Sequence, residues 1–198
     1  MSERTNRHHA RRNTARATTP YVALPYDAHA PDLARLESVI GYRFKHKDLL
    51  LRAMTHASML GSEQGAVVKE SNERLEFLGD RILSFLVDHY LFVNYPALME
   101  GDLTILHSAV VANETLTEYA AALDLCAHLR YARGTHINGT KIPADTFEAL
   151  LAAIYLDRGK LSNVEKLLLR FIPQKVEACR QELDWAHLVR DVEKNTKH

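Results

Sequence analysis

The segment 71–93 combines the most apolar helical pattern in the sequence with paired carboxylates, and few folds can accommodate both. Apolar residues occur nearly all the way round the expected helix, which is typical of a helix in a protein core. Glu76 and Asp80 lie four residues apart and share one helix face, with Glu73 one turn before Glu76. No cation stands three or four positions from Glu76 or Asp80. Because unpaired buried carboxylates are costly, the sequence predicts a partner from outside the helix, and a divalent metal is the leading candidate.

A second acidic pair follows Pro143 in another apolar helical pattern. Asp145 and Glu148 are three residues apart and share a face, and we expect no cation at helical distance from them. If the two helices pack antiparallel or crossed, four carboxylates meet in a site suited to Mg²⁺ or Mn²⁺. Such a metal activates water in phosphodiester hydrolysis and stabilises charge on the phosphate and the leaving oxygen.

The helix dipole offers another explanation for two of these acids. Glu73 and Asp145 fall in first helical turns, where a carboxylate is favoured by the dipole alone. Glu76 lies deeper, and so does Asp80. Dipoles do not explain acidic pairs on the two most apolar helices, so the metal hypothesis depends on both pairs together.

Helical patterns account for the rest of the chain. No segment shows strand alternation, so the sequence predicts an all-α fold. Gly41 and Gly159 are expected to end helices, Asn113 to cap one and Pro143 to lie in a first turn. The other expected helices cover residues 32–40, 47–54, 102–111, 114–123, 143–158 and 162–172, with a last one from 173.

Charge is distributed unevenly along the 198 residues, although the formal net charge is zero. Residues 1–20 contain five Arg and one acid, whereas residues 21–159 contain twelve Lys/Arg and eighteen Asp/Glu, a net charge of −6. An acidic body with a basic arm suits a metal site together with a polyanion contact. A solvated terminus and an organellar transit peptide are the alternative interpretations of that arm.

Three further residues bear on the class of protein. Cys126 and Cys179 have no metal-ligand spacing and are expected to be reduced thiols, with Cys126 filling the core. His56 is expected to be structural, because no hydrolytic partner pattern accompanies it.

No apolar run reaches the ~20 residues of a transmembrane helix, and the N-terminus lacks the apolar core of a secretory signal.

The acidic motifs resemble those of the ribonuclease III family. The run Asn72–Asp80 is similar to the family signature, and Asp145–Leu150 followed by Ala153–Gly159 is similar to its second motif. The resemblance covers about residues 32–172. Shorter matches occur in the expected order at Gly41–Phe44, Thr55–Ser58 and Glu100–Thr104.

This resemblance implies an all-helical endonuclease domain that forms a homodimer and cleaves double-stranded RNA with Mg²⁺, Mn²⁺ being a second candidate. Phe77 would be the aromatic plug of the dimer interface. Glu73 would lie behind the metal ligands without binding the metal itself, or it would line the groove. The metal and catalytic carboxylates would be Glu76, Asp80, Asp145 and Glu148.

Two departures from the family pattern accompany the resemblance. Arg81 occupies a position where family members often have a small residue, so its charge can perturb the site or reach a phosphate. We also expect a compact member without a double-stranded-RNA-binding domain, with recognition by shape and backbone. The expected division is a flexible basic leader over 1–31, the helical domain over 32–172 and a C-terminal helix and tail over 173–198.

Two functions from different classes fit these observations. The first is the endoribonuclease, cytoplasmic or organellar, and neither secreted nor membrane-bound. The alternative is a ribonuclease III-fold structural protein of a mitochondrial large ribosomal subunit, with ribosomal RNA and ribosomal proteins as partners. A subunit of a heterodimer is a third possibility. The four carboxylates favour the nuclease, since a scaffold has no physical need for unpaired acids beside RNA.

Overall fold

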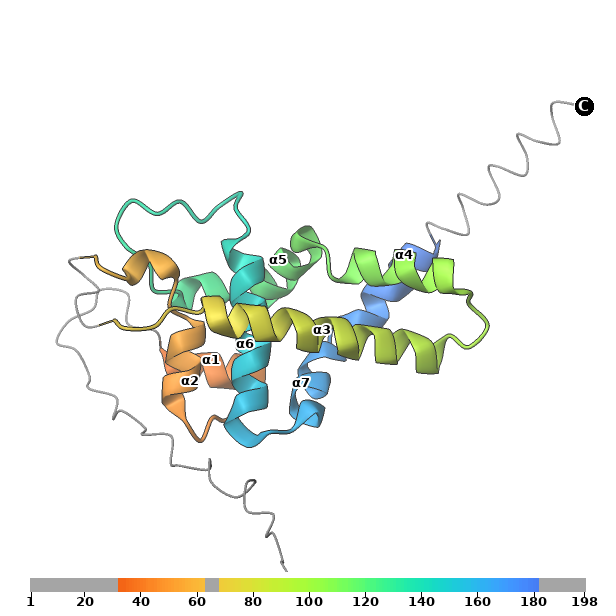
Figure 1. The fold of residues 1–198 in the computed structure, drawn as a ribbon, viewed down its shortest axis with the longest axis horizontal. Coiled ribbons are helices and arrows are strands. Elements are labelled where there is room, and N and C mark those ends of the chain that lie inside the picture. The colour runs from red at the N-terminus through yellow and green to blue at the C-terminus, as the bar shows by residue number, and fades with distance from the viewer. Residues whose placement is uncertain (1–31, 63–67, 182–198) are drawn as a thin grey trace, which may run out of the picture.

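Helices make up nearly all the regular structure of residues 32–62 and 68–181, the ranges that this computed structural model describes (Figure 1). Within these ranges the only strand-like pairing is an isolated bridge between Thr55 and Arg130. The all-α prediction is confirmed. The elements are α1 (Leu33–Ile40), α2 (Lys47–Ala53), the 3₁₀ turn η1 (Ala57–Met59), α3 (Glu73–Asn94), α4 (Glu100–Val110), α5 (Asn113–Ala122), the 3₁₀ turn η2 (Leu125–His128), α6 (Ile142–Arg158), α7 (Leu161–Leu168) and a helical stretch over 172–181.

Helix α6 is the centre of the domain. Its side chains are buried on every side, including Phe147, Leu150 and Leu151, each with no exposed surface. A helix that is apolar all round needs neighbours all round, and α6 packs against α3, α5, α2 and α7. Figure 1 shows α3 crossing α6 on the near side.

The crossing of α3 and α6 depends on Gly79. A Cβ atom added there would lie 1.9 Å from the backbone oxygen of Glu148, a distance that no real side chain can occupy. The two backbones therefore approach each other to a degree that only glycine allows at this position.

Several predicted helix boundaries are confirmed. Gly41 and Gly159 end α1 and α6 in the left-handed conformation, with φ of 74° and 66°. Pro143 lies in the first turn of α6, where its missing N–H costs nothing. These signals are local, so the sequence alone locates them well.

Three structural expectations are wrong. Asn113 is the first residue of α5 and does not cap it, because Ala112 holds the cap position. Helix α7 ends at Leu168 and not at 172, since a turn precedes Pro173, whose ring would clash with the carbonyl group one turn earlier in a continuous helix. Cys126 is exposed and does not fill the core.

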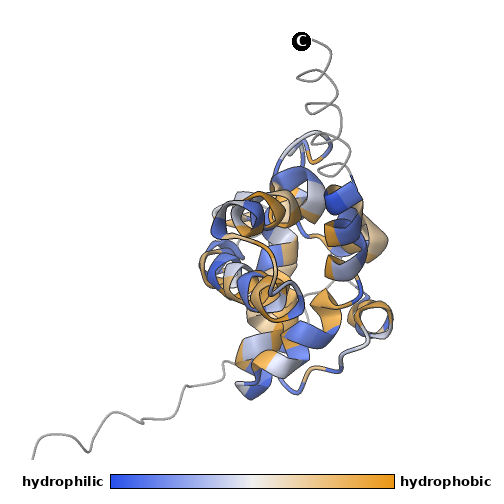
Figure 2. Cartoon of the chain, turned by 90° about the vertical axis from the view of Figure 1, so that its right-hand side faces the viewer, coloured by the Kyte–Doolittle hydropathy of each residue, from blue (hydrophilic) through white to orange (hydrophobic). Residues whose placement is uncertain are grey.

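Helix α3 is buried on one side and exposed on the other, although its nearly all-round apolar pattern predicts a core helix. Leu75, Leu83 and Val87 face the core, whereas Phe77 and Phe92 are 70% and 74% exposed. Figure 2 looks onto the α3–α4 end of the molecule and shows apolar residues interspersed with polar ones along these helices. None of the helices in the described ranges is long and apolar enough to cross a membrane.

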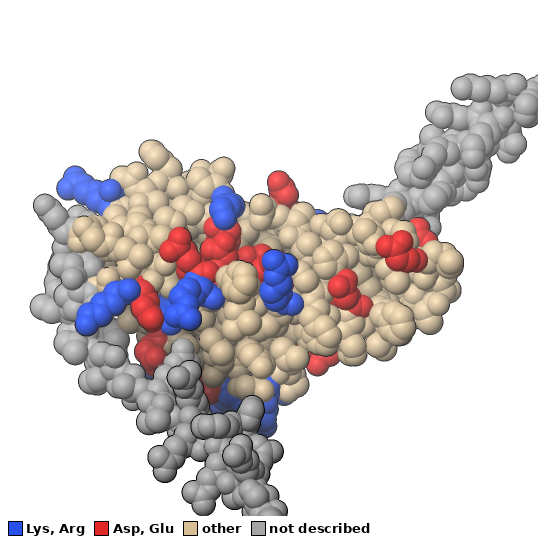
Figure 3. Space-filling model, in the orientation of Figure 1, with Lys and Arg blue, Asp and Glu red and all other residues tan. Residues whose placement is uncertain are grey.

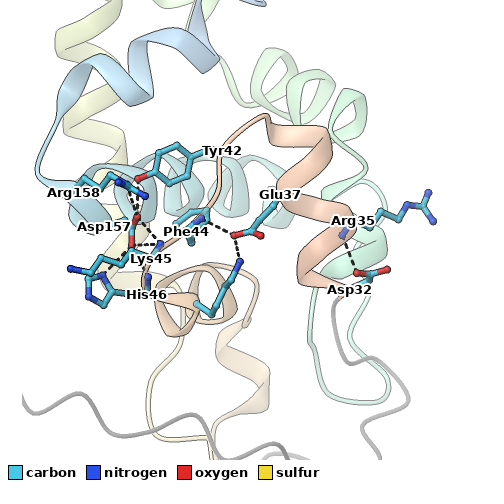
Figure 4. Close-up of polar contacts among 10 residues, drawn as sticks. Asp32, Arg35, Glu37, Tyr42, Phe44, Lys45, His46, Asp157 and Arg158 are labelled. Atoms are coloured by element: carbon cyan, nitrogen blue, oxygen red, sulfur yellow. Dashed lines mark hydrogen bonds and ion pairs between the residues drawn. The ribbon is translucent and has the colours of Figure 1, made fainter.

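A buried carboxylate fastens the far end of α6 to the segment before α2 (Figure 4). Asp157 accepts hydrogen bonds from the Tyr42 hydroxyl at 2.8 Å and from the backbone N–H groups of Lys45 and His46 at 3.0 and 2.8 Å. Burial alone would raise the pKa of Asp157, but these hydrogen bonds outweigh it and lower the pKa. Asp157 is therefore ionised and structural.

The close approach at Gly79 leads to a first prediction. Gly79→Ala should destabilise the protein by about 2 kcal/mol or more, because its methyl group meets backbone that cannot move aside without separating the helices. Chemical denaturation measures this loss. The matched control is Gly101→Ala in α4, where an added Cβ meets nothing within 4 Å; it should be neutral or stabilising. Equal effects of the two substitutions would contradict the role given to Gly79.

Candidate functional site

Three of the four predicted carboxylates meet where α3 crosses α6. One oxygen from each of Glu76, Asp145 and Glu148 lies within 4.8 Å of the others. Glu76 comes from α3, and the other two come from the first turns of α6. All three are partly buried, so the cluster combines limited solvation with a high density of negative charge.

The helix crossing itself places the acids. Glu76 precedes Gly79 by three residues on α3, and Glu148 supplies the carbonyl group that Gly79 approaches on α6. The two helices are therefore closest at the point where both carry carboxylates. Gly79 is a site-forming residue that sequence reasoning missed, although a glycine inside an apolar helix is a usable signal of close packing.

Repulsion and burial act together on the pKa values of the cluster. Burial, and after it the charges of Asp80, Asp145 and Glu76, together raise the pKa of Glu148 to about 7. Burial and Asp145 also raise the pKa of Glu76. The folded protein therefore resists full ionisation of these acids.

A lysine compensates part of this charge, which corrects the expectation that no cation lies near the second pair. The Lys141 ammonium is 3.1 Å from Asp145 Oδ2 and 3.6 Å from Glu76 Oε1. Asp145 and Glu76 in turn raise the pKa of Lys141. The helix was expected to begin at Pro143, so Lys141, four residues before Asp145, lay outside it.

Asp80 lies beside the cluster and outside the group of three. Its Oδ2 is 3.2 Å from the Arg81 guanidinium, so the charge of Arg81 lies directly beside this acid. Asp80 is still close enough to raise the pKa of Glu148. The structure thus brings three of the predicted carboxylates together and leaves the fourth next to them.

Glu73 and His56 have local contacts. Glu73 is exposed in the first turn of α3 and accepts a hydrogen bond from the Ser71 hydroxyl at 2.9 Å. His56 Nδ1 accepts from the backbone N–H of Ser58 at 3.1 Å and so caps η1. The structural role predicted for His56 is confirmed.

The surface around the cluster carries both signs of charge. Figure 3 shows acidic side chains gathered near the middle of one face, with Lys and Arg beside them. The Arg81 and Lys141 side chains are 70% and 64% exposed. Exposed cations next to a carboxylate cluster suit a polyanionic substrate whose backbone passes over a metal.

Comparison with known proteins identifies the domain. Residues 46–175 match the family model described as Ribonuclease-III-like. The chain is 40% identical over 147 residues to Ribonuclease 3 of Symbiobacterium thermophilum, with 73% of this chain and 61% of the relative covered. It is 41% identical over 149 residues to Ribonuclease 3 of Caldanaerobacter subterraneus, with 73% and 64% covered. The chain therefore spans about three fifths of the length of the curated relatives it matches.

A solved structure agrees with the sequence matches. The nuclease domain of ribonuclease III from Campylobacter jejuni superimposes with a TM-score of 0.64 at 34% identity, covering 73% of this chain and 98% of that one. That structure is described as showing flexibility in the region involved in dimer formation. Dicer from Pichia stipitis superimposes with a TM-score of 0.53 at 28% identity, over 69% of this chain and 58% of that one.

The raised pKa of Glu148 predicts how stability depends on pH without metal. As pH rises from the usual glutamate pKa toward about 7, the unfolded chain releases this proton first, so unfolding becomes easier. Glu148→Gln cannot ionise and should avoid this loss. In EDTA, the difference between the melting temperature of the variant and that of wild type should therefore be more positive at pH 8 than at pH 5. The same difference at both pH values would show that the Glu148 pKa is not raised.

Proposed function

The chain belongs to the ribonuclease III family, and from that premise we propose that it is a metal-dependent endoribonuclease that cleaves double-stranded RNA. One observation carries the proposal, namely the meeting of Glu76, Asp145 and Glu148 within 4.8 Å on two crossed core helices. This arrangement raises the pKa values of Glu148 and Glu76, so it destabilises the folded protein when these acids are ionised. The need to fold therefore does not explain it. A divalent cation would reverse this disadvantage.

The donor set fits a hard cation. Carboxylate oxygens are the ligands that Mg²⁺ and Mn²⁺ prefer, and no sulfur or imidazole group belongs to the three-residue cluster. We infer that Glu76, Asp145 and Glu148 hold the metal, and that Asp80 joins them directly or through a bound water. Mg²⁺ is the expected ion, with Mn²⁺ as a substitute.

When bound, the metal would activate water and stabilise negative charge on the phosphate and the leaving oxygen. The chain's own groups then have defined tasks. Ionised Glu148 and Asp80 accept hydrogen bonds from water and so orient it, while the rigid α3–α6 crossing keeps the acids in place. Glu73, exposed at the start of α3, lines the approach to the site.

Cations beside the cluster would contact the RNA backbone. Arg74 and Arg81 are exposed on α3, and Lys141 is exposed at the start of α6. Contacts of this kind neutralise phosphates and do not read bases, so recognition would follow the shape of the duplex. Binding should weaken steeply as salt concentration rises.

A second copy of the chain is the proposed partner of the exposed side of α3. Phe77 is 70% exposed directly next to Glu76. A groove of about 560 Å³ between α3 and α4 is lined by apolar residues, among them Phe85 and Phe92, together with polar ones such as Asp88 and His107. Exposed apolar surface of this extent marks an interface, and a two-fold dimer pairs such a surface with itself. The Campylobacter relative has a region involved in dimer formation.

The ribosomal scaffold is the weaker candidate. The matched relatives described above are named Ribonuclease 3 and come from bacteria, so they support neither a ribosomal role nor a mitochondrial location. The clustered acids also lie where a scaffold would need to tolerate RNA phosphates. The nuclease explains the cluster, whereas the scaffold leaves it unexplained.

Glu148→Gln should reduce cleavage of a long RNA duplex in Mg²⁺ by at least about a hundredfold, because it removes a metal-binding charge at nearly constant volume. Circular dichroism should show an intact fold. The matched control is Glu118→Gln, an exposed acid on α5 that is 3.8 Å from Lys175; its cleavage rate should equal that of wild type. Full cleavage by the Glu148 variant would remove this residue from the site.

Phe77→Ala should weaken self-association by about 2 kcal/mol or more, since truncating a buried interface aromatic typically costs that much. Light scattering over a concentration series measures the change. Leu169→Ala removes another exposed apolar side chain, 46% exposed beyond α7, and should leave assembly unchanged. A wild-type protein that stays monomeric at high concentration would refute the homodimer.

A further inference from the structure

We propose that Lys141 is a built-in counter-ion of the carboxylate cluster, which takes the place of the metal when none is bound and thereby sets the metal affinity. The inference rests on the proposed function, because it takes the cluster to be a metal site. A site made only for a divalent cation needs no ammonium group among its ligands. The position of Lys141 therefore calls for an explanation.

The contacts of Lys141 join the two helices of the site. Its Nζ is 3.1 Å from Asp145 Oδ2 on α6 and 3.6 Å from Glu76 Oε1 on α3. These acids are two of the three whose oxygens gather within 4.8 Å. The ammonium group thus satisfies charges from both sides of the crossing, as a bound cation would.

The N-cap position does not explain this lysine. Lys141 is the N-cap residue of α6, where a cation opposes the helix dipole and a small polar side chain is preferred. It also makes no side-chain cap hydrogen bond. The favourable interactions of this residue in the described structure are those with the two acids.

The side chain can leave without disturbing the helix. The backbone of Lys141 is fixed, because its carbonyl group accepts from the Asp145 N–H at 3.0 Å. Its side chain is 64% exposed and carries the charge on a flexible stem. The ammonium can therefore turn into solvent while Asp145 stays in position.

Competition for the same oxygens follows from this geometry. A metal that binds Asp145 and Glu76 must displace the ammonium, so the metal-binding free energy is reduced by the strength of the two ion pairs. Arg81 does not share this role, since it pairs with Asp80, outside the group of three. Lys141 therefore stabilises the metal-free protein and weakens metal binding at the same time.

The test compares three variants with wild type. Lys141→Met removes the charge and keeps most of the stem, Lys141→Arg keeps the charge, and Lys166→Met is the control. Lys166 is an exposed lysine on α7, the helix that follows the C-terminal end of α6, whereas the acids lie near the N-terminal end of α6. Melting temperature is measured in EDTA and along separate Mg²⁺ and Mn²⁺ titrations, since a bound ligand raises it.

We expect Lys141→Met to melt lower than wild type in EDTA and to reach half of its metal-induced shift at about fivefold lower metal concentration, the size expected for two partly exposed ion pairs. Lys141→Arg should stay within about twofold of wild type, and Lys166→Met should not differ from it. A second measurement uses wild type alone. Acetylation followed by mass spectrometry should show Lys141 becoming more reactive when metal is added, with Lys166 unchanged.

The outcomes separate the two proposals. If metal raises the melting temperature of wild type and Lys141→Met with the same half-saturating concentration, the inference about Lys141 is overturned and the metal site stands. Unchanged acetylation of Lys141 on metal addition overturns it equally. If metal shifts the melting temperature of neither protein, the metal site proposed here is wrong, and the role of Lys141 is rejected with it.

Discussion

The close approach of α3 to α6 at Gly79 determines both the packing of the domain and the position of its acids. The backbone oxygen of Glu148 occupies the space that any side chain at Gly79 would need. Because α6 is buried on every side, its position relative to α3 also decides how α2, α5 and α7 pack around it. The same contact lies at the acids, so the fold and the site share one determinant.

At that contact, burial of the carboxylates and repulsion between them destabilise the folded state. Burial and mutual repulsion raise the pKa of Glu148 to about 7, and the free energy for holding these acids together comes from the apolar packing of α3 and α6. Proteins commonly accept such local costs at functional sites. Lys141 offsets part of the cost in the metal-free protein through its contacts with Asp145 and Glu76.

Helix α3 connects the two halves of the proposed function. Its inner side carries Leu75 and Leu83 into the core, while Phe77 and Phe92 stay exposed on the outer side. Glu76 and Phe77 are adjacent in sequence and so point in different directions, one toward the acids and one toward solvent. A partner that covers Phe77 would therefore be positioned directly beside the acidic cluster, which links assembly to activity.

Features that depend on near neighbours along the chain could be predicted from the sequence. Helical periodicity placed Glu76 with Asp80 and Asp145 with Glu148, and Gly41 and Gly159 located helix ends, because these relations act within a few residues. The folded structure was needed to show that Glu76 meets Asp145 and Glu148 and that Lys141 bridges two helices. It also decided that Cys126 and one side of α3 are exposed. The meeting of the acids depends on how α3 and α6 cross, and helical periodicity carries no information about a crossing that is set by backbone clearance at Gly79.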